Sequence, residues 1–255
     1  MVLETVGFIV LGVAIGTIGT LIGAGGGFIL LPVLALLYPL EPTGTLTATT
    51  LAVVAANATS GAIAYGRQGR IDLRAGSLFA LATLPGGIAG VMLGRTVPRG
   101  PFDVAFALVL FALALVLVRL EPERSRPAAA RRRLLLGMAI SFVIGFASSL
   151  LGIGGGFIHV PVLIAVLGFP VHIATATSHY VLAISATVGT LTHLLAGDLS
   201  STWPRTVAIA SGAIVGAQLG AVLSRRVHGG LIVRILALAL VVVALRLAAQ
   251  GLLGL

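Results

Sequence analysis

The sequence predicts an all-α membrane protein that crosses the bilayer many times, and three observations lead to this fold class. Hydrophobic residues make up 58% of the 255 positions, charged residues only 9%, and the mean hydropathy is +1.15, whereas about a quarter of the residues of a soluble domain are charged. Long stretches contain no Asp, Glu, Lys or Arg: 5–40, 42–66, 75–94, 134–197 and 206–224. These stretches are continuous rather than alternating, which favours helices over the strands of a β-barrel.

The distribution of charge indicates orientation in a lipid bilayer rather than a nucleic-acid partner. The chain has a formal net charge of +9 and a pI of about 11.7, values that in a soluble chain suggest nucleic acid. Its 16 basic residues are all arginine and lie between the apolar stretches, as they do in multi-span proteins. No cysteine is present, which excludes disulfides and thiolate metal sites. The first apolar run lacks a preceding basic segment, so we interpret it as a retained span.

The chain contains two copies of one pattern. Residues 23–34 read Gly-Ala-Gly-Gly-Gly-Phe-Ile-Leu-Leu-Pro-Val-Leu, and residues 152–163 read Gly-Ile-Gly-Gly-Gly-Phe-Ile-His-Val-Pro-Val-Leu. A second match pairs Thr-Ala-Thr-Thr at 47–50 with Thr-Ala-Thr-Ser at 175–178. Duplications of this kind are common in transporters. We therefore expect three regions, which are a first membrane repeat (1–120), a basic cytoplasmic linker (121–133) and a second membrane repeat (134–255).

Each of these two homologous halves contains five apolar segments, the second of which is short for a membrane crossing. The segments are expected at 3–22, 27–38, 45–65, 75–95 and 102–119, and at 134–151, 156–169, 173–195, 205–224 and 231–250. If all ten cross, the halves are inverted, and twelve of the 16 arginines lie on the side of a cytoplasmic linker. If the short segments re-enter, eight full spans remain, the halves are parallel, and eleven arginines lie inside. Both topologies stay open.

Each run of three glycines predicts a break before a short or re-entrant helix. Glycine costs roughly 1 kcal/mol relative to alanine in a helix interior. Free N–H groups at the start of the following helix suit an anion at membrane depth. The alternative is that glycine only permits close packing, but the duplication favours a substrate-binding role. The candidate residues are Gly25, Gly26 and Gly27, and Gly154, Gly155 and Gly156.

Polar side chains in the apolar segments extend this candidate site. Hydroxyl and amide groups can bind an oxyanion without the cost of a buried charge. The candidates are Thr49, Thr50 and Asn57 in the first half and Thr177, Ser178 and His179 in the second. His159 and His179 are also candidates for carrying a coupling proton or for gating. For each hydroxyl, the alternative is a bond to the carbonyl one helical turn back.

Carboxylates lie only at segment ends or in connections. Since cation transporters usually place Asp or Glu at the membrane centre, we expect an anionic substrate. Ser178 and His179 are adjacent on a helix and point about 100° apart, so they cannot pair as nucleophile and base. The sequence has no Walker loop, His-Glu-x-x-His motif or acidic metal cluster. We predict no enzyme activity, no catalytic residue, no metal and no cofactor.

The residues resemble the sulfite exporter TauE/SafE family. The resemblance is carried by the duplicated Gly-x-Gly-Gly-Gly-Phe-x-x-x-Pro-x-Leu motif, by the Ala-Thr-Thr and Ala-Thr-Ser stretches, and by late glycine ladders at 86, 90 and 94 and at 212, 216 and 220. It covers both halves. The motif residues carried over are Gly25, Gly26, Gly27 and Pro32, Gly154, Gly155, Gly156 and Pro161, together with Ala48-Thr49-Thr50 and Ala176-Thr177-Ser178.

This resemblance implies a secondary transporter in the plasma membrane of a bacterium or archaeon, exporting a sulfur anion such as sulfite, thiosulfate or an organosulfonate. Two alternatives stay open: a passive anion channel, and a non-transporting membrane subunit of a sulfur-metabolism complex. The expected partners are the anion, the lipid bilayer and a coupling proton. We interpret the glycine ladders as packing seams. They also leave a homodimer open.

Overall fold

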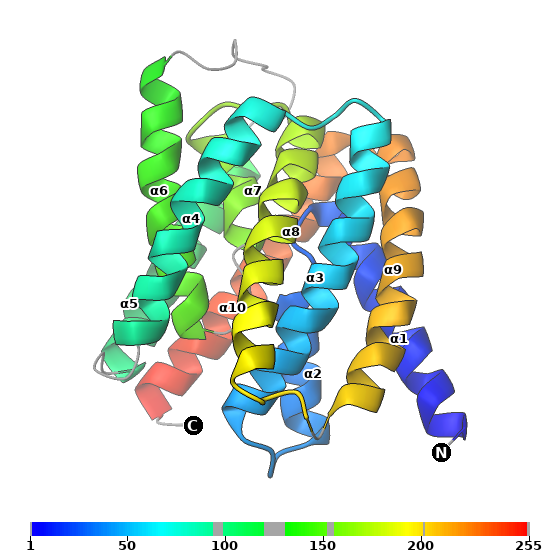
Figure 1. Cartoon of the computed structure of the whole chain (residues 1–255). Helices are drawn as coiled ribbons and strands as arrows, with labels where there is room; N and C mark the ends of the chain where they lie inside the picture. The colour runs from blue at the N-terminus through cyan, green and yellow to red at the C-terminus, as the bar shows by residue number, and fades with distance from the viewer. Residues whose placement is uncertain (1, 94–98, 120–130, 152–155, 201, 254–255) are drawn as a thin grey trace.

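The computed structural model is a bundle of α-helices (Figure 1). It describes residues 2–93, 99–119, 131–151, 156–200 and 202–253. The helices are α1 (Val2–Ile22), α2 (Gly27–Leu37), α3 (Thr43–Arg67), α4 (Leu73–Leu93), α5 (Arg99–Arg119), α6 (Arg131–Leu151), α7 (Gly156–Ala165), α8 (Val171–Leu195), α9 (Trp203–Arg226) and α10 (Gly229–Leu253). No strand occurs in these ranges, so the predicted all-α class is confirmed.

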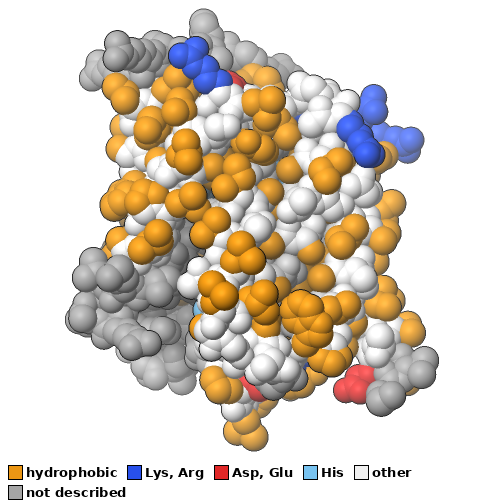
Figure 2. Space-filling model, in the orientation of Figure 1, with side chains coloured by type: hydrophobic (Ala, Val, Ile, Leu, Met, Phe, Trp, Pro, Cys, Tyr) orange, Lys and Arg blue, Asp and Glu red, His pale blue; other side chains and the backbone are white. Residues whose placement is uncertain are grey.

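The outer surface of the bundle is apolar, as a lipid-facing surface must be. Leu81, Leu108 and Leu238 point outward and are 65%, 66% and 66% exposed. Figure 2 shows hydrophobic side chains over the middle of one face and arginines towards its upper end. Within the described residues, α1, α3, α9 and α10 are each long and apolar enough to cross a membrane. These properties confirm the predicted polytopic membrane protein.

Glycines let pairs of helices pack with their backbones in contact. A Cβ on Gly16 of α1 would stand 2.6 Å from Ala213 O of α9, and a Cβ on Gly216 of α9 would meet the backbone of α1. The α4–α6 pair is built in the same way, because a Cβ on Gly86 would meet Phe142 O. A larger side chain at these positions would push the helices apart. The predicted packing role of the ladders is confirmed at Gly86 and Gly216.

The closest helix pairs connect the first five helices with the last five. α1 packs along α9 and α4 along α6, while α3 packs along α8 and α5 along α10. If each helix is replaced by the one five places away in the chain, the α1–α9 pair becomes the α6–α4 pair. The α3–α8 and α5–α10 pairs are each replaced by themselves. In Figure 1, α1 begins at the lower end of the bundle and α6 at the upper end. This arrangement agrees with the inverted topology considered above, although the boundaries of the halves stay a prediction.

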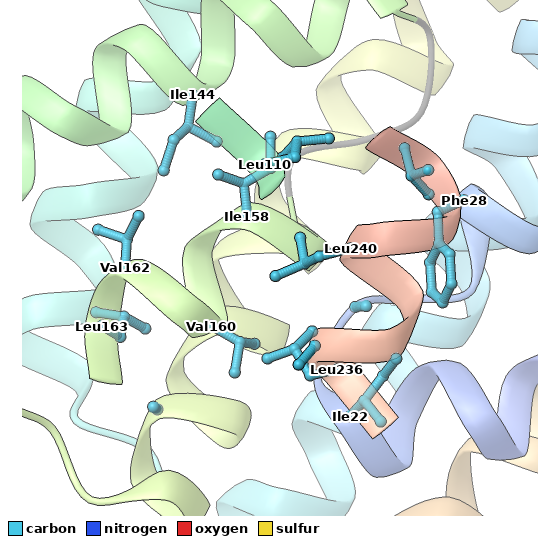
Figure 3. Close-up of a cluster of buried hydrophobic side chains, with 14 of the residues drawn as sticks. Ile22, Phe28, Leu110, Ile144, Ile158, Val160, Val162, Leu163, Leu236 and Leu240 are labelled. Carbon is cyan, nitrogen blue, oxygen red and sulfur yellow. The ribbon is translucent and has the colours of Figure 1, made fainter. Parts of the chain in front are cut away.

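The short helices α2 and α7 lie inside the bundle. Leu30 and Leu34 of α2 and Val160 of α7 are each 0% exposed. Figure 3 shows α7 residues such as Val160 in one hydrophobic cluster with Leu236 and Leu240 of α10. Pro32 and Pro161 lie within α2 and α7 rather than ending them. Each glycine run is therefore followed by a helix whose first turns are buried, whereas Leu36 and Leu37 at the end of α2 are exposed.

The helix ends lie within three residues of the predicted bounds, except for the end of α7. α6 begins at Arg131, so the last three residues assigned to the linker form the first turn of a helix. α7 ends at Ala165, before the predicted end at 169, because Gly168 takes a left-handed φ of 73° and the Phe169 amide turns back to Leu163 O.

Candidate substrate-binding site

The chain turns sharply at the first glycine run, between α1 and α2. Gly23, Gly25 and Gly26 have φ values of 78°, 72° and 78°, a left-handed conformation that costs other residues roughly 1–2 kcal/mol. The amides of Ala24 and Gly25 donate to the same carbonyl, Gly19 O, at 2.8 and 3.1 Å. Glycine is therefore required by the backbone here, and the turn lies in the protein interior.

Two backbone N–H groups at the start of α2 have no hydrogen-bond acceptor among the described residues. Gly26 is the N-cap residue of α2 and Gly27 is its first residue. Both are buried, and neither amide donates to an acceptor in the described part of the chain. The start of a helix carries partial positive charge. A small anion at this point would satisfy both N–H groups.

The first glycine turn lies against the start of α7. A Cβ on Gly156, the first residue of α7, would stand 3.3 Å from the carbonyl atoms of Ala24. The hydroxyl of Ser178, on α8, lies between the two segments, 3.2 Å from Gly23 O and 3.0 Å from Gly156 O. It can donate its single proton to only one of these two carbonyls at a time. Ser178 therefore joins the first glycine turn to the helix that follows the second. Gly154 and Gly155 lie outside the described residues.

A buried chain of hydrogen bonds, which we call the central relay, runs from His179 through Thr20 and Asn57 to the carbonyl of Gly25. Thr20 Oγ1 lies 3.2 Å from His179 Nε2 and 3.2 Å from Asn57 Oδ1. Asn57 Nδ2 donates to Gly25 O at 3.2 Å. The side-chain members are all 0% exposed. The central relay therefore ties α1, α3 and α8 to the glycine turn.

The carbonyl of Gly25 fixes the direction of every bond in the central relay. A carbonyl only accepts hydrogen bonds, so the nitrogen of the Asn57 amide faces Gly25 and its oxygen faces Thr20. Thr20 must then donate its one proton to Asn57. The hydrogen between His179 and Thr20 consequently belongs to Nε2, and a neutral His179 ring has a bare lone pair on Nδ1.

His179 Nδ1 is the open end of the central relay. It is buried and makes no hydrogen bond with the described residues. The ring is held edge-on to Tyr65, with centroids 5.9 Å apart, and the Tyr65 hydroxyl donates to Thr20 O at 2.7 Å. Leaving a buried polar atom without a partner costs about 1–3 kcal/mol. Such atoms are expected where a group has a function beyond stability.

Three of the threonines predicted for the site lie elsewhere. Thr49 donates to Thr202, near the start of α9, at 3.1 Å. Thr177 accepts a bond of 3.0 Å from the Asp72 amide, at the connection between α3 and α4. Thr50 donates to the carbonyl of Leu46, one turn back, which is the alternative weighed from the sequence.

His159 is also separate from the central relay. Its Nε2 lies 3.3 Å from Ser141 Oγ, between α7 and α6, and it is 2% exposed. Of the candidates in the described residues, those that the structure brings together around the first glycine turn are Gly25, Gly26, Gly27, Asn57, Gly156, Ser178 and His179.

Thr20 and Tyr65 belong to this site, although the sequence analysis did not select them. Thr20 lies in the last turn of α1, just before the glycine run, and this position was the available signal. A hydroxyl one turn before a helix break is well placed to face the groups that the break exposes. Tyr65 had no comparable signal, because its contact with His179 depends on how α3 packs against α8.

The interior contains no acidic side chain at the described positions. The buried polar residues there are Ser, Thr, Asn and His alone. No group of three or more His, Cys, Asp or Glu side chains in the described chain could hold a metal ion. A cation would meet no counter-charge in this interior, whereas a small anion would meet neutral donors.

A model of the family described as sulfite exporter TauE/SafE matches residues 8–247. The chain belongs to this family. The match spans both glycine runs and every member of the central relay. Membrane transport is therefore the general activity of this TauE/SafE chain, and no solved structure matches it.

Curated relatives of this TauE/SafE chain carry transporter names. It is 28% identical over 267 residues to the "Probable membrane transporter protein YunE" of Bacillus subtilis, covering 95% of this chain and 97% of the relative. It is 29% identical to a "Probable membrane transporter protein" of Xylella fastidiosa, covering 81% and 79%. The archaeal "Probable membrane transporter protein MJ0441" of Methanocaldococcus jannaschii is 26% identical, covering 74% and 72%.

The two halves of this TauE/SafE chain do not contribute equally to the site. In the predicted repeat, Leu51 is the counterpart of His179, and Gly189 is the counterpart of Gly61. A Cβ on Gly61 would stand 2.5 Å from His179 Nε2, and a Cβ on Gly189 would stand 3.4 Å from Leu51 Cδ1. The same helix contact thus holds an imidazole in one half and an aliphatic side chain in the other.

Proposed function

We propose that this chain is a secondary transporter that exports a small sulfur-containing oxyanion, such as sulfite, thiosulfate or an organosulfonate, across the plasma membrane. The family match and the names of the relatives support membrane transport. The family description supports a sulfur anion and the export direction.

The central relay is the observation that carries this proposal. Its open end, His179 Nδ1, is buried in an interior whose described polar groups are neutral donors and acceptors. The unused N–H groups of Gly26 and Gly27 belong to the glycine turn that the relay holds. An oxyanion here would be bound by these amides, and by Ser178 once its hydroxyl turns away from the carbonyls of Gly23 and Gly156. Gly154, Gly155 and Gly156 would provide the second half of the cradle.

His179 also offers a route for coupling to protons. A proton on Nδ1 would turn this atom from an acceptor into a donor and give the ring a positive charge. The protonated ring would attract an anion, and the neutral ring would release it. Binding of a proton and of an anion would therefore favour each other.

The test is counterflow of labelled sulfite in proteoliposomes that contain only this protein, with thiosulfate and a sulfonate as competitors. A carrier gives counterflow, and the competitors rank its substrates. Weakly saturating flux without counterflow would indicate a passive channel. Absence of flux with all three anions, from protein that elutes as a single folded species, would overturn the proposal and favour the subunit alternative.

The role of His179 is tested separately with His179→Asn. We expect uptake driven by a pH gradient to fall by about ten-fold, a change that corresponds to about 1.4 kcal/mol. Counterflow at equal pH should fall less, since the glycine amides remain. His228→Asn is the matched control, because His228 is exposed and outside the site. Equal losses in both assays would contradict proton coupling through His179.

A further inference from the structure

A small apolar cluster lies near the upper end of the bundle, apart from the main core. It consists of Ala64 and Tyr65 of α3, Ala176 of α8 and Ala221 of α9, with Ile71 packed against it. Three helices and the α3–α4 connection therefore meet at one place. In Figure 1 this is the end where α3 joins α4 and where α9 joins α10.

Four polar side chains lie close in sequence to the members of this cluster. Gln68 lies three residues after Tyr65, and Arg70 precedes Ile71. His172 lies one helical turn before Ala176, and Ser224 lies one turn after Ala221, so each shares a helix face with its cluster residue. We call Gln68, Arg70, His172 and Ser224 the upper polar group.

Contacts between these residues support their convergence. Gln68 Nε2 donates to Ala221 O at 3.3 Å, across from α3 to α9. Ser224 is 0% exposed and lies beside the Tyr65 hydroxyl. The Arg70 guanidinium interacts electrostatically with both Tyr65 and His172. The four side chains thus lie beside the small apolar cluster at one end of the bundle.

Each member of the upper polar group has a buried polar atom without a hydrogen bond. These atoms are Gln68 Oε1, Arg70 Nη1, His172 Nδ1 and Ser224 Oγ, and they are four of the seven such side-chain atoms in the described residues. A native interior has few unsatisfied polar groups. Four of them at one place indicate a ligand that supplies their partners.

The chemistry of these atoms defines the ligand. Arg70 supplies a permanent positive charge and an N–H donor, and Ser224 supplies an O–H donor. Gln68 Oε1 is an acceptor, because the Gln68 nitrogen is used by Ala221 O. The nearest carboxylate on this connection, Asp72, already accepts the Ala75 amide at the start of α4 at 2.9 Å. A small oxyanion carrying one hydrogen satisfies three of these atoms, since its hydroxyl donates to Gln68 and its oxygens accept from Arg70 and Ser224. His172 Nδ1 completes the set as a third donor when it carries the proton of the imidazole ring.

We propose that the upper polar group is a second oxyanion-binding site, at the arginine-rich upper end of the bundle and separate from the glycine turns. Tyr65 connects it to the central relay, because its hydroxyl lies beside Ser224 and donates to Thr20 O. The site would bind the anion from solution before the anion reaches the glycine turns. Its role in transport rests on the proposed function, whereas binding itself does not.

The experiment measures binding of ³⁵S-labelled sulfite to the purified full-length protein in detergent, without any transport assay. The wild type is compared with Arg70→Gln, Ser224→Ala and the control Arg74→Gln. Arg74 lies in the first turn of α4 at the same end, and it is exposed. We expect the affinity to fall about ten-fold or more in Arg70→Gln and a few-fold in Ser224→Ala, and to stay unchanged in Arg74→Gln.

A second arm distinguishes a free anion from a lipid headgroup. Native mass spectrometry of the same proteins tests for a phosphatidylglycerol adduct that Arg70→Gln loses and Arg74→Gln keeps. Such an adduct, displaced by sulfite, supports the site with a phosphate headgroup as an additional ligand.

Sulfite binding that neither Arg70→Gln nor Ser224→Ala weakens would overturn the site. So would a wild-type protein that binds neither sulfite nor the lipid. Binding that depends on Arg70 in a protein without sulfite flux keeps the site and rejects the proposed transport function, so the two failures are distinguishable. If Arg70→Gln fails to elute as a folded species, Ser224→Ala and His172→Gln decide the result.

Discussion

Gly61 of α3 lies directly against the imidazole of His179 on α8. A Cβ at position 61 would stand 2.5 Å from both Nε2 and Cδ2 of the ring, closer than non-bonded atoms approach. The absence of a side chain at Gly61 therefore sets the position of the ring. The His179 contact with Thr20 depends on that position.

Gly61→Ala is expected to displace His179 and disrupt the central relay. Overpacking of this kind costs about 1–3 kcal/mol, and we expect sulfite counterflow to fall by about ten-fold or more. Gly189→Ala is the matched control, since its Cβ would stand 3.4 Å from Leu51 Cδ1, and its counterflow should stay close to the wild-type value. Equal losses in the two variants would show that the position of the imidazole is unimportant.

Thr20→Val is expected to reduce both stability and transport. Valine keeps the shape of threonine but leaves Asn57 Oδ1 and His179 Nε2 without partners, at a cost of about 1–3 kcal/mol for each unsatisfied group. Thermal unfolding in detergent measures the stability, and counterflow measures the transport.

Two further variants separate the hydroxyl of Thr20 from its shape. Thr17→Val removes a hydroxyl whose one bond among the described residues is to Val13 O, one turn back on the same helix, and should change little. Thr20→Ser keeps the hydroxyl and should therefore keep most of the wild-type activity that Thr20→Val loses. Failure of Thr20→Ser to recover any activity would argue against the relay as the cause.

The ion pair between Glu41 and Arg205 is expected to stabilise the lower end of the bundle. The two side chains bond through two N···O contacts of 3.0 and 2.6 Å, and the guanidinium lies 3.9 Å from the centroid of the Tyr38 ring. Arg205 is 10% exposed and Glu41 29%, so solvent screens the pair in part. A double-mutant cycle with Glu41→Gln and Arg205→Gln, read by thermal unfolding, should give a coupling of about 1–2 kcal/mol. A coupling near zero would mean that the pair contributes nothing to stability.

The glycine seam between α1 and α9 is expected to tolerate no larger side chain. Gly216→Leu would drive a side chain into the backbone of Val13, and we expect little folded protein by size-exclusion chromatography. The control is Gly7→Ala on the same α1, where no atom lies within 4 Å of the added Cβ. Alanine should stabilise that helix by up to about 1 kcal/mol. A well-folded Gly216→Leu protein would contradict the close approach of the two helices.

The helices were predictable because hydrophobicity and glycine act locally. Uncharged stretches of membrane length gave the helix positions, and the triple glycine at Gly25–Gly27 gave the turn after α1. The direction in which each side chain points was harder to predict from the sequence. Thr49 and Asn57 lie on the same helix, yet Thr49 meets Thr202 and Asn57 meets the glycine turn, because different neighbours cover different faces of α3.

The site was predicted in part for the same reason. Asn57, Ser178 and His179 were selected because a polar group in an apolar helix needs a partner, and the structure gives Asn57 and Ser178 partners in the glycine turn. Thr20 was missed because nothing local distinguishes a hydroxyl that crosses to another helix from one that bonds its own, as Thr17 does. That distinction depends on residues far along the chain, Asn57 at 37 and His179 at 159 positions from Thr20.

The pairing of α1 with α9 has a consequence for how the protein is made. The ribosome completes α1 long before α9, so α1 enters the bilayer with its glycine face covered only by lipid, which is as apolar as its later partner. During this interval the face is available to the α9 of another copy as well as to its own. High expression should therefore favour exchanged dimers, in which each copy supplies α1 to the other. For the same reason, a cut in the linker should leave the two fragments bound to each other, because the α1–α9 and α4–α6 seams both cross between them.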